Sequence, residues 1–324
     1  MPSSVKERHR RFRIGALLGR RLIDKVFGGY FRLARENFRS EMERNAVLAA
    51  QQRIAQMKAE PPVARIRDAE FRVFSQFGED GIIQYLIHHV PIKNDTFIEF
   101  GVEDYDEANT RFLLVNNNWR GLILDQNPAL TAKLCSDPMY WRHELIAVSS
   151  FITPENIDRL IEGAGFSGDV GLLSIDVDGN DYWVWRAISV VSPRIVVCEF
   201  NSLFGWRYPV SVSYDKDFDK TRAHYSNLFF GASLPALCHL AKEKGYEFVG
   251  SNSTGGNAFF VRRDLARDLP RPTVEEGYVR SRFRSSAGPD GRLTFLTGDA
   301  RIEAIAALEV VDVVTGQKRK VSEL

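Results

Sequence analysis

The sequence lacks the features that would set it apart from ordinary globular proteins. It has only 3 cysteines, Cys135, Cys198 and Cys238, and their spacing fits neither a disulfide framework nor a zinc site. No apolar run approaches the roughly 18 residues that a membrane helix requires, and the stretch IGALLG stops at Arg20-Arg21. We therefore expect a cytoplasmic protein without a membrane span or a secretion signal.

The sequence also has almost no net charge, but its charges are divided unevenly. Residues 1–60 contain 14 Lys and Arg against 6 Asp and Glu, whereas residues 61–324 contain 29 against 36. The acidic main part argues against a nucleic-acid partner. The basic first part predicts contact with an anionic surface or with the acidic part itself.

Residues 1–60 are predicted to form a helical arm. Apolar residues recur there at spacings of three and four, as on one face of an amphipathic helix: Ile14, Leu18, Leu22, Val26, Tyr30 and Leu33. Good helix formers continue up to Pro61-Pro62, which mark the boundary to the next domain. We expect the arm to pack on that domain or on a second copy in a homo-oligomer; peripheral binding to a membrane surface is the alternative.

Residues 61–270 have the pattern of repeated strand and helix units. A helix opened by Ser75 or Gln76 precedes five apolar strands, at 97–100, 121–125, 144–148, 171–175 and 194–200. Two more strands, 246–249 and 258–261, flank the turn SNSTGGN. This pattern predicts a doubly wound, mostly parallel, seven-stranded Rossmann-like α/β sheet with an antiparallel hairpin at its end. Residues 271–324, with a short helix near 301–308, are expected to lie over it as an extension or lid.

The segment FIEFGVEDYDEANT, residues 97–110, is the predicted cofactor site. It reads as a buried strand, a turn at Gly101 and the start of a helix, so its backbone N–H groups are expected to face a ligand. In sheets of this kind ligands bind in the crevice beyond the carboxyl ends of the strands.

Acidic residues end four of the five parallel strands, namely Glu99, Asp125, Asp176 and Glu199. Buried carboxylates are costly unless a ligand, a metal ion or a hydrogen-bond donor meets them. Asp125 follows Glu99 by 26 positions, close to the roughly 20 expected for a carboxylate that binds ribose hydroxyls.

The segment SIDVDGND, residues 174–181, predicts a divalent cation site. Oxygen ligands suit Mg²⁺, and we expect Asp176, Glu199 and Asn201 to supply them. The alternative is an Asx-rich turn without a metal. Such an ion would bind and acidify a hydroxyl group, and the proton would pass to His224 or Asp178.

Six motifs in one order resemble the FkbM-type S-adenosylmethionine-dependent methyltransferases: SQFGEDG, FIEFGVEDYDEANTRFLL, WRGLILD, LLSIDVDGNDYWVW, RIVVCEFN and GASLPAL…NAFFVR. The resemblance covers residues 71–268 and implies a class I methyltransferase fold. It also implies an enzyme that methylates a hydroxyl of a sugar, a glycan or a glycosylated small molecule.

The resemblance also implies the residues that hold the cofactor. Glu99 and Gly101 would meet its methionine part, Asn109 and Thr110 its carboxylate, and Asp125 its ribose. Ala147 or Val148 would lie near the adenine, and Gln76 and Asp176 would complete the cofactor site.

One departure keeps two other functions open. Glu103 and Tyr105 stand where such loops commonly have further glycines. A protein that binds the cofactor without turnover is therefore one alternative. The other is a glycosyltransferase, because Asp176-Val177-Asp178 has the form of a DxD metal-binding element.

Overall fold

The computed structural model describes residues 5–324, together with the side chains of residues 29–324 except those of Arg32, Glu36, Cys135 and Pro138. The chain divides into two compact units, residues 1–52 and 53–324. One helix, α1 (Val5–Ala59), contributes residues to both units and ends just before Pro61-Pro62. The apolar positions predicted at Ile14, Leu18, Leu22 and Val26 lie outside the described side chains. Within residues 5–324, no helix combines the length and the apolar character needed to cross a membrane.

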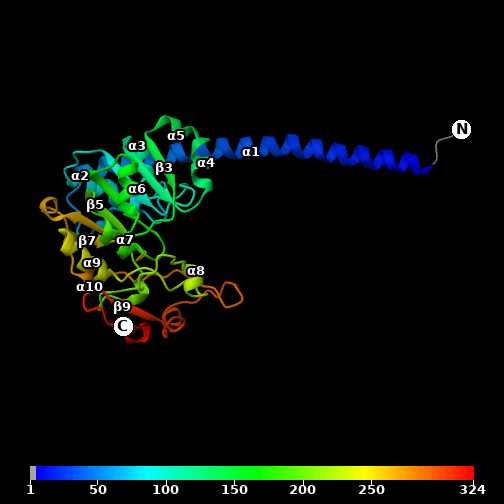
Figure 1. The fold of residues 1–324 in the computed structure, drawn as a ribbon. Coiled ribbons are helices and arrows are strands. Elements are labelled where there is room, and N and C mark those ends of the chain that lie inside the picture. The colour runs from blue at the N-terminus through cyan, green and yellow to red at the C-terminus, as the bar shows by residue number, and fades with distance from the viewer. Residues whose placement is uncertain (1–4) are drawn as a thin grey trace. The chain divides into compact units, whose positions relative to one another are not determined.

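Seven strands form the central sheet of the larger unit, in the order β3-β2-β1-β4-β5-β8-β7 (Figure 1). They are β1 (Thr96–Phe100), β2 (Arg120–Asp125), β3 (Leu145–Ser149), β4 (Gly168–Ile175), β5 (Val191–Glu199), β7 (Tyr246–Ser251) and β8 (Asn257–Arg262). Strands β1 to β5 are parallel, whereas β8 pairs antiparallel with both β5 and β7. This confirms the predicted class I methyltransferase fold, a doubly wound, mostly parallel sheet with an antiparallel hairpin end.

Helices cover both faces of this sheet, because its strands are apolar on both sides. In β1, Ile98 and Phe100 pack in one core cluster with α6 (Ile157–Gly163), α7 (Asp181–Ala187) and α9 (Leu234–Lys244). Phe97 points to the other face and packs with α2 (Glu79–His89), α3 (Arg111–Asn117) and α4 (Ala129–Cys135). A short helix, α5 (Pro138–Arg142), precedes β3.

Helix α2 begins at Glu79, later than the predicted start at Ser75 or Gln76. The Asp80 carboxylate accepts the backbone N–H groups of Val73, Phe74 and Ser75, which holds those residues in a turn. In return, the Ser75 hydroxyl accepts the N–H of Asp80. Ser75 therefore stabilises the start of the helix from outside it.

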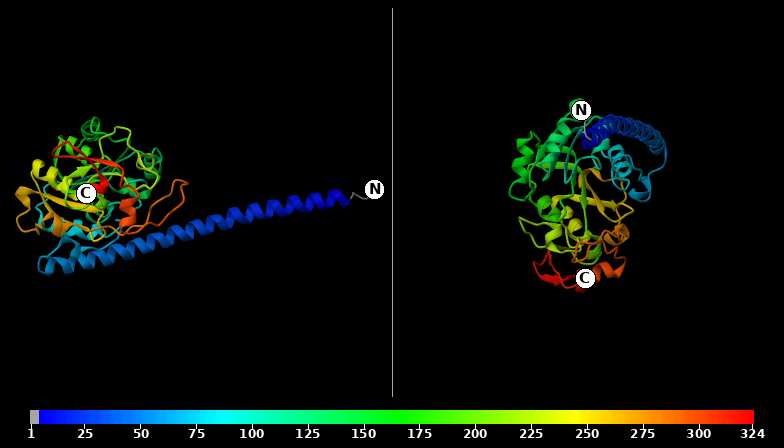
Figure 2. Two further views of the ribbon diagram at one scale, coloured as in Figure 1. Left: turned by 90° about the horizontal axis from the view of Figure 1, so that it is seen from below. Right: turned by 90° about the vertical axis from the view of Figure 1, so that its right-hand side faces the viewer.

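The C-terminal extension packs on the sheet domain through a second, small sheet. Its strands β9 (Glu309–Asp312) and β10 (Lys318–Lys320) join β6 (Val210–Ser211) in the order β10-β9-β6. The extension also contains α10 (Val274–Gly277) and α11 (Asp299–Glu303), the latter near the predicted helix at 301–308. Within the larger unit, β9 and the C-terminus lie at the end opposite to α3 and α5 (Figures 1 and 2).

Candidate active site

A pocket of about 1080 Å³ lies at the carboxyl ends of the parallel strands. Its floor includes residues that end or follow β1, β2, β3, β4 and β5, and two loop segments, 102–109 and 217–222, complete its walls. No residue of 271–324 is among the described residues that line it, so the predicted lid does not form this wall. The segment 217–222, with α8 (Lys220–Ala223), takes that place.

The pocket is strongly acidic. Its described lining contains two basic side chains, Lys220 and Arg222, against eleven carboxylates: Glu99, Glu103, Asp104, Asp106, Glu107, Asp125, Asp176, Asp178, Glu199, Asp217 and Asp219. A field of this sign disfavours an anionic ligand and attracts a cationic one.

Gly101 makes the turn that joins β1 to the pocket. Its φ is +73°, and a Cβ atom there would lie 1.4 Å from the carbonyl oxygen of Asp176. Only glycine allows the β1 and β4 loops to approach this closely. The predicted glycine turn is confirmed, and two independent constraints, the positive φ and the close approach of Asp176, explain why position 101 is a glycine.

Glu99 is turned into its own loop. One carboxylate oxygen accepts the N–H of Asn109 at 2.8 Å, and the other accepts the N–H and the hydroxyl of Thr110. The Ser174 hydroxyl donates a further hydrogen bond to it. The N–H groups of Asn109 and Thr110, predicted to meet the cofactor carboxylate, are therefore already bound to Glu99. Burial raises the pKa of Glu99, and these hydrogen bonds act in the opposite direction.

Asp125, at the end of β2, retains free hydrogen-bonding capacity. One of its oxygens accepts the N–H of Glu103 and the other that of Asn127, each at 2.7 Å. A carboxylate has about four acceptor sites, so each oxygen keeps one for a ligand. Asp125 lines the pocket and is 7% exposed. It therefore suits the predicted hydrogen bonds to ribose hydroxyls.

The loop after Gly101 keeps a glycine-like path without further glycines. Glu103 and Tyr105 have φ of +49° and +62°, in the left-handed region that glycine adopts most easily. The buried Tyr105 hydroxyl lies 3.1 Å from that of Thr110, and the backbone of Glu103 is bound to Asp125. These contacts hold both residues in a strained backbone conformation. The loop therefore keeps the path that glycines would allow, although Glu103 and Tyr105 stand in their places.

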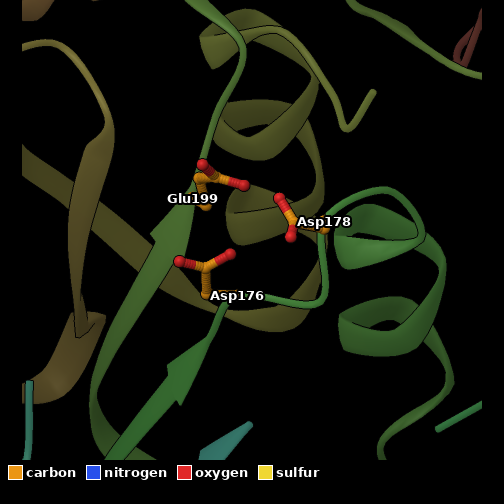
Figure 3. Close-up of side chains that lie close together, drawn as sticks. All are labelled: Asp176, Asp178 and Glu199. Carbon is orange, nitrogen blue, oxygen red and sulfur yellow. The ribbon is translucent and has the colours of Figure 1, made fainter. Parts of the chain in front are cut away.

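Three carboxylates converge on one point of the pocket (Figure 3). Asp176 follows β4, Glu199 ends β5 and Asp178 lies on the loop to α7. One carboxylate oxygen of each lies within 4.8 Å of those of the other two. Burial raises the pKa of Asp176 and Glu199 well above the usual range, and repulsion by the neighbouring carboxylates adds to this.

The donor set of this cluster fits a hard divalent cation. All its ligand atoms are carboxylate oxygens, and the buried Oε2 atom of Glu199 has no hydrogen-bond partner among the described residues. Lys220 Nζ lies 2.5 Å from Asp178 Oδ1 and contributes one positive charge. The single ammonium group of Lys220 does not balance three ionised carboxylates, so a divalent cation bound there would stabilise their ionised forms.

The predicted alternative, an Asx-rich turn, is also present but is carried by a different residue. Asp181 accepts the N–H groups of Val177 and Gly179 at 2.7 and 3.0 Å. Burial raises the pKa of Asp181 to about 6. Because Asp181 supports the turn, Asp176 and Asp178 remain directed into the pocket (Figure 3).

The structure does not bring every predicted site residue to the pocket. Asn201 is buried, and its amide binds the N–H of Leu203 and the carbonyl groups of Leu228 and Phe230. The Asn201 side chain therefore does not belong to the acidic cluster, and its prediction as a metal ligand is wrong. Asp178 is the third member of the cluster instead.

Three further predicted residues, Thr110, His224 and Ala147, lie outside the described pocket lining, as does Val148, the alternative to Ala147. Thr110 is buried and bound to Glu99. His224 Nδ1 lies 2.7 Å from the Ser226 hydroxyl, and burial lowers its pKa. Ala147 pairs with Ile123 inside the sheet, and Ser150, Phe151 and Ile152 line the pocket beyond β3 in its place.

Several lining residues carry no signal in the sequence. Asn180 and Asn257 line the pocket although the sequence analysis did not predict them. Gln76, which was predicted, lines it as well. Asn180 is 4% exposed and its Oδ1 has no hydrogen-bond partner among the described residues. Lys220 is separated from Asp178 by 42 positions, so no local spacing signals their contact.

No protein-family model matches the chain, and no curated protein matches it either. Solved structures give distant similarities. The N-terminal domain of EvdMO1 with SAH bound is 11% identical, over 66% of this chain and 94% of that one, with a TM-score of 0.38. The CurJ carbon methyltransferase is 12% identical, over 56% and 52%, with a TM-score of 0.36. An S-adenosylmethionine-dependent methyltransferase from Clostridium acetobutylicum is 7% identical, over 56% and 89%, with a TM-score of 0.36. Values this low add nothing to the argument from strand order and residues.

Proposed function

We propose that this chain is an S-adenosylmethionine-dependent O-methyltransferase of the FkbM type. The observation that carries the proposal is the acidic pocket at the carboxyl ends of a sheet with class I methyltransferase strand order, with Asp125 at the end of β2. S-adenosylmethionine carries a sulfonium and an ammonium group, so it is the kind of ligand that an acidic pocket attracts. Asp125 accepts hydrogen bonds from its ribose hydroxyls.

The second part of the proposal places Mg²⁺ at the acidic cluster, with Asp176 and Glu199 as its ligands. When bound there, the ion would lower the pKa of a coordinated hydroxyl and fix its position. Asp178 is the most exposed of the three carboxylates and lines the pocket. We assign it the role of accepting the hydroxyl proton, in preference to His224, which is not among the described lining residues.

The acceptor in this proposal is a hydroxyl of a sugar, a glycan or a glycosylated small molecule. The excess of carboxylates in the pocket supports an uncharged acceptor over a phosphorylated one. The side chains of Gln76 and Asn257 offer amide groups of the kind that bind hydroxyls.

The test combines binding with turnover. Calorimetry with S-adenosylmethionine and with UDP-glucose, each with Mg²⁺ and with EDTA, should show binding of the former only. Methyl transfer to a panel of glycans should then fall in EDTA and in Asp176→Asn and Asp178→Asn, while His224→Ala stays active. Full activity in EDTA and in Asp176→Asn would refute the metal role alone, and full activity in Asp178→Asn would refute its role as the proton acceptor. Failure to bind S-adenosylmethionine would refute the whole proposal.

A further inference from the structure

Lys220 is a cation already built into the acidic cluster. Its ammonium group lies 2.5 Å from Asp178 Oδ1 and 4.4 Å from the centroid of the Phe230 ring. The side chain is 28% exposed. It also lies close enough to Glu199 and Asp176 for both to interact with it electrostatically. A divalent cation at this cluster would therefore meet a positive charge at the same carboxylates.

The segment that carries Lys220 is held mainly by contacts outside the cluster. The Asp219 side chain accepts the N–H groups of Thr221 and Arg222 and so supports α8 locally. The Phe218 ring packs closely on Gly179: a Cβ atom added at position 179 would lie 2.2 Å from that ring. These contacts can persist if the flexible end of the lysine moves, since a lysine side chain has a flexible four-carbon stem.

We propose that Lys220 competes with the divalent cation for the acidic cluster, so that the ammonium group leaves Asp178 when the metal binds. This rests on the metal site of the proposed function and adds a residue that sets its affinity. Two positive centres a few ångströms apart repel each other strongly in a half-buried site, so removing the ammonium charge should tighten metal binding by at least about tenfold. Metal binding should in turn release Lys220 Nζ into the pocket.

The matched variants are Lys220→Met, which removes the charge and keeps the length, and Lys216→Met, four positions earlier. Lys216 pairs with Asp217, is 74% exposed and lies outside the described pocket lining. Mn²⁺ affinity, measured by electron paramagnetic resonance of free Mn²⁺ without cofactor or acceptor, should rise in Lys220→Met and stay unchanged in Lys216→Met. Asp176→Asn added to Lys220→Met should abolish binding, which places the ion at the cluster.

A second measurement follows the lysine itself. An amine-selective acetylating reagent, with peptide mass spectrometry, should modify Lys220 faster with saturating Mg²⁺ than without it. Weaker or equal Mn²⁺ binding by Lys220→Met would overturn the proposal, because Lys220 would then only position Asp178. Absence of Mn²⁺ binding in every variant would overturn it too. Calorimetry with S-adenosylmethionine on the same proteins keeps that failure separate from failure of the methyltransferase assignment.

Discussion

A methyl group at position 101 would disturb the contact between the β1 and β4 loops. In Gly101→Ala the added Cβ atom would lie 1.4 Å from the Asp176 carbonyl oxygen, whereas carbon and oxygen normally stay about 3.3 Å apart. The end of β4 would have to move by about 2 Å to restore that separation. Because Asp176 belongs to the acidic cluster, the displacement would reach the proposed metal site as well.

The expected loss of stability has two parts. An L-residue at φ of +73° is strained by about 1–2 kcal/mol. Forcing an extra methyl group into a packed site adds about 1–3 kcal/mol. Gly245→Ala is the matched control, because Gly245 has φ of +83° but nothing within 4 Å of the added atom. It should show the first part alone.

Thermal unfolding followed by near-ultraviolet circular dichroism measures the difference. Gly101→Ala should unfold at least about 2 °C below Gly245→Ala, since the second part is at least about 1 kcal/mol and each 1 kcal/mol shifts the midpoint by about 2–4 °C in a large domain. Its Mn²⁺ affinity should also fall, while that of Gly245→Ala should not. Equal midpoints for the two variants would refute the close approach of the two loops.

Three further predictions follow from the site and the arm. Glu199 has a folded pKa well above its unfolded value, so the stability linked to it is present below about pH 4 and is lost as pH rises through the folded pKa. The free energy of unfolding, measured by urea titration, should therefore decrease less steeply in Glu199→Gln as pH rises above about 5. The same dependence on pH in the variant and the unaltered protein would contradict this. Asp125→Ala should weaken S-adenosylmethionine binding by about 1.5–3 kcal/mol in calorimetry, the range for a hydrogen bond to a charged group; unchanged affinity in the folded variant would refute the ribose assignment. Deletion of residues 1–52 should leave that affinity intact, whereas deletion of residues 1–60 should lower stability because Met57 is part of the core; loss of binding in the shorter deletion would place the boundary elsewhere.

The elements of the sheet could be read from local patterns. Apolar runs such as GLILD and RIVVCEF begin within strands β2 and β5, because a strand buried on both faces must be continuously apolar. The predicted start of helix α2 was too early. There a reciprocal pair of contacts between Ser75 and Asp80 keeps the preceding residues in a turn, which residue propensities alone do not reveal.

The candidate site was only partly predictable. Glu99, Asp125, Asp176 and Glu199 were placed at the strand ends, because the length of each apolar run sets where its strand stops. Their partners were not predictable. Glu99 binds the loop amides expected to face the cofactor, and Asn201 binds a loop 27 to 29 positions away.

Local sequence is enough to specify the strands, the turn at Gly101 and the edge of the sheet at which acidic residues collect. Each depends on the nearest few residues, through side-chain periodicity and backbone freedom. Long-range packing settles which of those acids are satisfied by the chain itself and which remain directed into the pocket. Hydrogen bonds depend on atoms meeting within about 3 Å, and Lys220 and Asp178 come to 2.5 Å across 42 positions only once β4, β5 and α8 are packed together.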